Sequence, residues 1–107
     1  KNELSQVVLA ILSNASDALK DIETPLIKIL IDANDAEIII SISNNGKQID
    51  KRDINKIFEP YFSTKKEGTG IGLYLSKMII KRSFDGDLKV ENNDKGVKFT
   101  LMFDKTV

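Results

Sequence analysis

The sequence has 107 residues, of which 41% are hydrophobic and 30% charged, so it suits one soluble globular domain and is too short for two. Its 16 lysines and arginines balance 16 aspartates and glutamates, and no excess charge indicates nucleic acid or an anionic membrane as a partner. Cysteine and histidine are absent, which excludes disulfides, thiolate metal sites and phosphorylation of this chain on histidine.

The first part of the chain predicts a helix followed by a β-hairpin. Apolar residues recur at helical spacing and predict an amphipathic helix over about residues 3 to 20. Residues 26–31 are apolar and rich in β-branched side chains, and isoleucines alternate over residues 38–42. A turn composition at residues 32–36 separates these two runs, which are therefore predicted to pair as antiparallel strands.

Regular periodicity fails between residues 44 and 70, where we expect only a short helix near residues 50–58. A long irregular connection in so small a domain is usually functional or disordered. A second long helix is predicted from residue 71 to about residue 83.

Alternating apolar residues near the end of the chain predict a closing hairpin around the turn at residues 92–96. Helices and hairpins in this order predict an α+β fold. We expect a two-layer α/β sandwich, in which helices cover one face of a mixed, mostly antiparallel sheet. Residues 1–107 are expected to form a single domain.

The chain starts without methionine and runs directly into the first helical pattern, so we interpret it as a fragment of a longer protein. No apolar run approaches the length needed to cross a bilayer, and no signal peptide is present. We expect a cytoplasmic fragment with no membrane contact of its own, while the parent protein can still be membrane-anchored.

The second predicted helix opens with Gly68-Thr69-Gly70-Ile71-Gly72. Glycines let the backbone approach a ligand closely, and a helix N-terminus presents unpaired N–H groups and partial positive charge. These features suit a phosphate group, although a tight loop-to-helix turn explains the glycines equally well. The segment is neither a P-loop nor a dinucleotide fingerprint, because no Gly-Lys-Ser/Thr follows it and no strand leads into it.

Asn14 lies at the edge of the apolar stripe of the first helix, with Val7 and Ala18 toward the core and Ala10 and Asp17 on the polar side. Its amide oxygen can occupy one position around Mg²⁺, which takes oxygen ligands and keeps several waters while it bridges phosphates. For an isolated asparagine, a hydrogen bond to nearby backbone is the simpler interpretation.

Taken together, these segments resemble the catalytic and ATP-binding domain of sensor histidine kinases, in the ATPase class shared with Hsp90, gyrase B and MutL. Residues 4–18 resemble the N box, residues 43–49 the first glycine box, residues 57–65 the F box and residues 68–73 the second glycine box. Residues 96–99 are similar to the motif of the last strand. The resemblance covers nearly the whole chain and implies the Bergerat-type ATP-binding fold.

The resemblance implies an ATP site between the two long helices, under a lid of about residues 50–70. Asn14 and Lys65 are the candidate catalytic residues: Asn14 as the Mg²⁺ ligand, and Lys65 as a lid residue that reaches the terminal phosphate or is simply solvated. Phe58 and Phe62 look like hydrophobic anchors of the lid. The implied nucleotide contacts are Asn14, Asp17, Asn44, Gly46, Ile49, Phe62, Lys65, Gly68, Thr69, Gly70, Ile71, Gly72 and Leu73. Asp17 is expected to act through water, or to be exposed.

The implied reaction is transfer of the γ-phosphoryl group of Mg-ATP to a histidine on a separate dimerisation and histidine phosphotransfer domain. The phosphoryl group would then pass to an aspartate of a response regulator. Such a transfer needs mainly positioning and charge neutralisation. The fragment alone is expected to be inactive in transfer, because it lacks the phosphoacceptor histidine.

The sequence departs from the family pattern at four positions. Asn44 replaces an aspartate that accepts a hydrogen bond from the adenine amino group, and a neutral acceptor is weaker than a charged one. Gln48 replaces a glycine and is expected to narrow the adenine slot, Val97 replaces a threonine, and Ala10 replaces an asparagine.

Two alternative functions follow from these departures. A kinase-like domain that binds nucleotide weakly or not at all could serve as a regulatory or scaffolding module. An Hsp90- or MutL-type ATPase is less consistent with the sequence, because those enzymes use a glutamate to activate water where this chain has Ala10.

Overall fold

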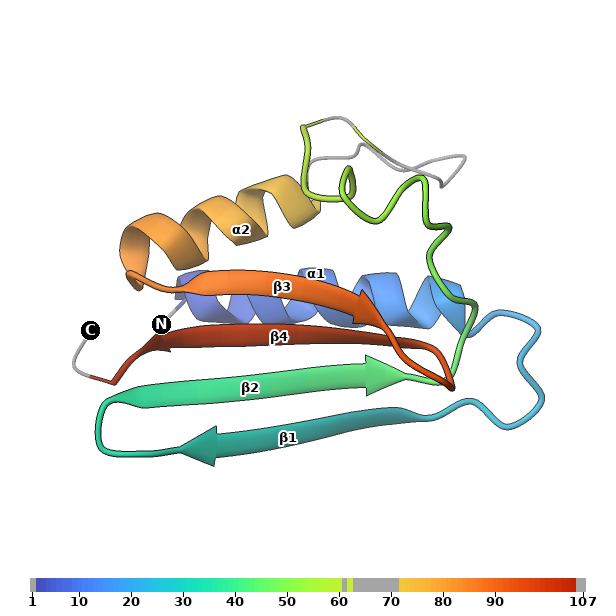
Figure 1. The fold of residues 1–107 in the computed structure, drawn as a ribbon, viewed down its shortest axis with the longest axis horizontal. Coiled ribbons are helices and arrows are strands. Elements are labelled where there is room, and N and C mark those ends of the chain that lie inside the picture. Colours follow the sequence, from blue (N-terminus) through green and yellow to red (C-terminus); the bar gives the residue numbers. More distant parts are fainter. Residues whose placement is uncertain (1, 61, 63–71, 106–107) are drawn as a thin grey trace.

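The computed structural model describes residues 2–60, 62 and 72–105 (Figure 1). Two helices, α1 (Asn2–Ala18) and α2 (Gly72–Ser83), pack on a sheet of four strands. The strands are β1 (Ile27–Ala33), β2 (Glu37–Asn44), β3 (Asp87–Asn92) and β4 (Val97–Asp104). These boundaries confirm the predicted order of helices and hairpins to within a few residues.

The sheet has the strand order β1-β2-β4-β3, and each described pairing is antiparallel. The two predicted hairpins are therefore confirmed, and β2 joins them by pairing with β4. No parallel pair occurs among the described strands, so this part of the sheet is antiparallel throughout rather than mixed. The two-layer α/β sandwich is confirmed.

The core lies between the two helices and one face of the sheet. Alternate residues of β4 are buried, and Phe99 and Leu101 on that strand face Ile42 and Ile40 of β2 across the ladder. From the helices, Val7, Ile11 and Ile80 fill the same core. The period of two in the strands and the period of 3.6 in the helices thus place their apolar faces in one layer.

The edge strand β1 leaves its apolar residues after Ile27 exposed. Ile29 and Ile31 lie on the same face as their core-forming partners Ile42 and Ile40, yet Ile31 is 71% exposed. The helices pack over β2 and β3 rather than over β1. This edge of the sheet is therefore apolar and exposed among the described residues.

The prediction of a short helix near residues 50–58 is wrong. Successive turns occupy the segment instead, with Asp53 N–H donating to Asp50 O at 2.8 Å and Lys56 N–H donating to Asp53 O at 2.7 Å. A single helical turn is costly to nucleate, and Pro60 disfavours a helical conformation at Glu59. The segment is therefore ordered by local turns and by its contacts with the core.

Within the described part of the chain, neither helix combines the length and apolar character that crossing a bilayer requires.

Candidate functional site

Helix α1 contacts both of the segments that are predicted to bind the nucleotide, the loop after β2 and the start of α2. Near its middle, Ala10 faces the start of α2 so closely that a methyl group on Gly72 would lie 3.9 Å from the Ala10 Cβ. At its C-terminal end, the Ala18 carbonyl accepts a hydrogen bond of 3.1 Å from the Lys47 N–H. The eight residue steps from Ala10 to Ala18 correspond to roughly 12 Å of helix. Asn14 lies midway between these two contacts and is half-buried.

Asn44, the last residue of β2, is one of two buried polar side chains among the described residues, the other being Ser76. Its Oδ1 atom accepts a hydrogen bond of 2.8 Å from the Gly46 N–H, which forms an Asx turn. Across the ladder, Asn44 is paired with Val97, which is 3% exposed. Val97, which takes the place of the threonine in the family pattern, therefore puts an apolar side chain directly beside the Asn44 amide.

Gly46 lies where no larger residue fits. A methyl group added there would stand 2.3 Å from the Ala18 carbonyl oxygen and 2.6 Å from its carbon. The loop after β2 therefore passes over the end of α1 in close backbone contact, which fixes Asn44 and Gly46 relative to the helix.

Ile49 is held by a side chain that sequence reasoning missed. Asn92 accepts from the Ile49 N–H at 2.9 Å and donates through Nδ2 to the Ile49 carbonyl at 2.8 Å. The Gln48 side chain donates to the Asn93 carbonyl and is exposed. For residues 92–93 the sequence predicts only a turn. They also tether the start of the β2–α2 connection to the β3–β4 hairpin, and Gln48 is engaged with that hairpin.

The predicted anchors of the lid pack onto the core. Phe58 and Phe62 are half-buried against it, as are Ile49 and Leu73. The Phe58 ring meets Phe99 edge-on at a centroid distance of 6.4 Å, and Lys77 Nζ lies 4.6 Å from the centre of the Phe58 ring. Both geometries are favourable for an aromatic ring. Phe58 and Phe62 thus hold the β2–α2 connection against the core.

The remaining predicted contacts fall into two groups. Asp17 is half-buried on α1, and Gly72 is exposed at the start of α2, where its carbonyl accepts a hydrogen bond of 2.7 Å from the Ser76 hydroxyl. Lys65, Gly68, Thr69, Gly70 and Ile71 lie outside the described residues, so their predicted roles remain predictions.

The Asp50 carboxylate has a lowered pKa. Hydrogen bonds from the Arg52 side chain, at 3.1 and 3.3 Å, and from the Arg52 backbone lower its pKa below the ordinary value. Any stability that this pair contributes is present above the pKa of the unfolded chain and is lost as the pH falls through the lower, folded pKa. The pair is exposed, so its contribution is small.

The described residues offer no acidic cage for a metal, since no three His, Cys, Asp or Glu side chains among them converge. A Mg²⁺ ion that bridges phosphates often takes only one or two protein oxygens and fills its other positions with phosphate oxygens and water. The half-buried Asn14 amide can supply such an oxygen.

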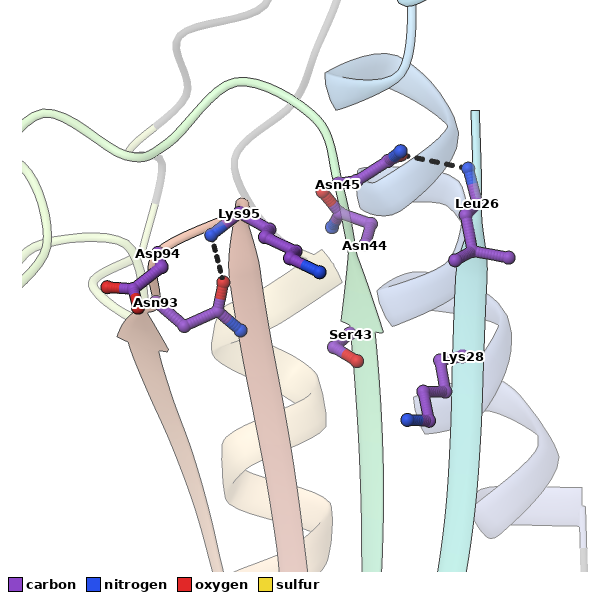
Figure 2. A pocket seen from close by; sticks show the side chains of 8 residues that line it. All are labelled: Leu26, Lys28, Ser43, Asn44, Asn45, Asn93, Asp94 and Lys95. Carbon is purple, nitrogen blue, oxygen red and sulfur yellow. Dashed lines mark hydrogen bonds between the residues drawn. The ribbon is translucent and has the colours of Figure 1, made fainter. Parts of the chain in front are cut away.

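A cavity of about 360 Å³ lies at the end of the sheet near the β3–β4 turn (Figure 2). Lys28 and Ser43 line it from the sheet face opposite the helices, because their neighbours Ile27 and Ile42 point to the core. Asn44 is the only predicted nucleotide contact in its wall. This cavity therefore shares only Asn44 with the predicted site along α1.

Comparison with known proteins places the whole chain in one family. Residues 1–107 match the family model described as histidine kinase-, DNA gyrase B-, and HSP90-like ATPase. The signal transduction histidine-protein kinase AtoS of Escherichia coli (strain K12) is 42% identical over 103 residues, covering 92% of this chain and 16% of AtoS. Sporulation kinase A of Bacillus subtilis (strain 168) is 30% identical over 106 residues, covering 98% of this chain and 17% of that kinase. The chain thus spans only a small part of these relatives.

Solved structures agree with the sequence comparison. The catalytic domain of the histidine kinase ThkA, in a nucleotide-free form, superposes with a TM-score of 0.86 at 32% identity, over 97% of this chain and 68% of the ThkA chain. The mycobacterial sensor histidine kinase MprB gives a TM-score of 0.83 over 96% of this chain and 70% of its own, but at 21% identity it shows a shared fold alone.

Proposed function

We propose, from the premise that this chain belongs to the histidine kinase-, DNA gyrase B- and HSP90-like ATPase family as an ATP-binding catalytic domain of the sensor histidine kinase type, that it binds Mg-ATP along α1. The γ-phosphoryl group of this ATP would be transferred to a histidine on another domain. The observation that carries the proposal is the arrangement on α1: the start of α2 meets Ala10, and the loop that holds the buried Asn44 meets Ala18. The two contacts are separated by roughly 12 Å along the helix, and Asn14 lies between them.

The two ends of this arrangement suit different parts of the nucleotide. The end at Asn44 is lined by one buried amide and by apolar neighbours such as Val97 and Ile49, which suits a planar purine base. The end at Gly72 is the N-terminus of a 12-residue helix, whose N–H groups and partial positive charge suit phosphates. We therefore place the base at Asn44 and the phosphates toward Gly72.

Asn14 would then lie level with the phosphate chain and contribute its amide oxygen to Mg²⁺. The bound ion would neutralise charge on the phosphate oxygens. The protein contributes rigid positioning, because Asn14 is on a helix whose Val7, Ile11 and Ala15 are fully buried. Lys65 and the Gly68–Ile71 segment are proposed to complete the phosphate end, as the family resemblance implies.

In the proposed transfer, an imidazole nitrogen of the partner domain attacks the γ-phosphorus. A nitrogen–phosphorus bond forms, the bond from phosphorus to the β–γ bridging oxygen breaks, and ADP leaves. The chain contains no histidine, so the acceptor must come from a dimerisation and histidine phosphotransfer domain. We propose that a response regulator then takes the phosphoryl group onto an aspartate.

Binding of nucleotide is expected to raise the melting temperature of the domain. At a concentration about 100 times the dissociation constant, a ligand stabilises the folded state by about 2.7 kcal/mol. For a domain of this size, that corresponds to a shift of roughly 10 °C. Differential scanning calorimetry with a non-hydrolysable ATP analogue and Mg²⁺ measures the shift, and an unchanged transition at millimolar nucleotide would instead support the scaffold-like alternative.

A further inference from the structure

We infer that the open edge of β1 binds a second copy of this chain, and that the two β1 strands pair antiparallel in a symmetric dimer. β1 is the outermost strand of the described sheet, where it pairs with β2 on one side (Figure 1). The outer side of such a strand presents N–H and C=O groups that can pair with another chain. The inference does not depend on the proposed function, since it uses no residue of the nucleotide site.

The backbone groups of alternate β1 residues point to the open edge. Just before the strand, the Leu26 carbonyl accepts from the Asn45 N–H at 3.2 Å, and just after it the Asn34 N–H donates to the Glu37 carbonyl at 3.1 Å. The register between these two bonds is continuous. Residues that bond to the neighbouring strand alternate with residues that do not. Even-numbered residues therefore bond to β2, and the residues that direct their backbone groups outward are Ile27, Ile29, Ile31 and Ala33.

The sequence of β1 is complementary to itself around Leu30. When a second β1 runs antiparallel with Leu30 opposite Leu30, every residue of the strand Ile27–Ala33 has a partner. Ile29 then lies opposite Ile31 of the second copy, and these pairs use the outward-facing backbone groups, as an antiparallel ladder requires. Lys28 lies opposite Asp32 of the second copy, and the symmetry of the dimer repeats this pair on the other side of Leu30.

The charged pair selects this register. Lys28 and Asp32 are exposed, and they lie on the sheet face opposite the helices. In the dimer they occupy non-hydrogen-bonded positions, where opposing Cα atoms are about 4.5 Å apart and side chains come close. Opposite charges stabilise such a pair, and like charges destabilise it. A register shifted by two residues would put either Lys28 or Asp32 opposite Leu30 and would lose both ion pairs.

The apolar residues of β1 gain burial in the same arrangement. Ile31 is 71% exposed and Leu30 is 56% exposed. The dimer gathers Ile29 and Ile31 of both copies on the helix side of the seam, and it packs Leu30 against its own copy on the other face. Because paired residues point to the same face, α1 and α2 of both copies lie on one side of a continuous sheet. Edge strands are usually protected by charges that repel a second copy, whereas here the charges attract it.

The test is sedimentation velocity of the unaltered chain over a range of concentrations, compared with Lys28→Asp and Asp32→Lys. The unaltered chain should show a reversible equilibrium of monomer and dimer. Each variant replaces two attractive pairs by two repulsive ones, so the dimer should weaken by about tenfold or more. An equimolar mixture of the two variants should dimerise again, because their edges carry opposite charges. This recovery also shows that both variants are folded.

Lys89→Asp is the matched control. Lys89 is exposed on β3, the other edge strand, and the variant makes the same change in net charge. It should dimerise like the unaltered chain, because β3 takes no part in the seam.

Amide hydrogen exchange gives a second measurement of the register. Dimerisation should slow exchange at Ile29 and Ile31, while the Lys28 and Leu30 amides, which already bond to β2, should change little. A chain that stays monomeric at millimolar concentration would overturn the inference, as would a mixture of the two charge variants that stays monomeric. Protected Ile29 and Ile31 amides in a monomer would show that another segment occupies the edge, and would overturn it too.

Discussion

A Gly46→Ala variant is expected to lose about 3 kcal/mol or more of folding stability, because overpacking at a rigid backbone contact has no cheap relief. The added methyl group would stand 2.3 Å from the Ala18 carbonyl oxygen and 3.0 Å from the Ala18 Cβ, well inside van der Waals contact. The neighbouring hydrogen bond from Lys47 to that carbonyl holds the two backbones together. In a domain of this size, the melting temperature should fall by more than about 10 °C.

The control for this prediction is Gly72→Ala. There the added methyl group would meet its nearest neighbour, the Ala10 Cβ, at an ordinary distance of 3.9 Å. Alanine also has a higher helix propensity than glycine, by about 1 kcal/mol in a helix interior. The melting temperature should therefore stay level or rise slightly. Chemical or thermal denaturation measures both variants, and equal stability of Gly46→Ala and the natural chain would show that the contact at Ala18 is not rigid.

An Asn14→Ala variant is expected to lose the Mg²⁺ dependence of nucleotide binding. Substitution of residues that only support a metal ligand weakens metal binding by about 10- to 100-fold, and removal of a direct ligand should cost at least as much. Phosphoryl transfer to the histidine of the parent protein should fall at least as steeply. Stability should change little by comparison, since Asn14 is only half-buried at the edge of the core.

Two further variants separate a metal ligand from a structural asparagine. Ser13→Ala alters an exposed neighbour on the same helix and should leave nucleotide binding as it is. Asn14→Asp keeps an oxygen ligand and should retain the Mg²⁺ effect. The measurement is nucleotide affinity with Mg²⁺ and with EDTA. If Asn14→Ala binds nucleotide as strongly as the natural chain and still responds to Mg²⁺, Asn14 is not the ligand.

Much of the fold could be predicted from the sequence, because its apolar pattern changes period where the elements change. The first helix has one apolar stripe, and Val97 to Phe103 alternate so regularly that every second residue is buried. Strand β1 shows the limit of this reasoning. Its apolar run predicts a strand correctly, but periodicity does not reveal that the helices leave Ile29 and Ile31 largely exposed.

The conformation of residues 50–58 was predicted wrongly for a different reason. Turns and short helices share the same local hydrogen bonds, and what decides between them here is the anchoring of Phe58 on Phe99 and the proline at residue 60. Such contacts join residues far apart in the chain, which a local pattern does not report.

The candidate site was predictable where motifs carried it and not where side-chain orientation decides the chemistry. Asn14, Asn44 and Gly46 are implied by the family resemblance, and all three lie on or beside the C-terminal half of α1 in the structure. The sequence did not reveal that Gly46 N–H holds the Asn44 oxygen, nor that Asn92 holds Ile49. Both depend on which atom of an amide faces a backbone group.

The most direct test of the site is a titration of the ¹⁵N-labelled chain with Mg-ATP, in which the chemical shifts of its backbone amides are recorded at each nucleotide concentration. Binding along α1 predicts saturable shifts at Asn14, at residues 44–49 and at Gly72, with little change at Lys28 and Lys95. Shifts confined to Lys28, Ser43 and Lys95, in the cavity on the opposite sheet face, would contradict the proposed site, as would an unchanged spectrum at millimolar nucleotide.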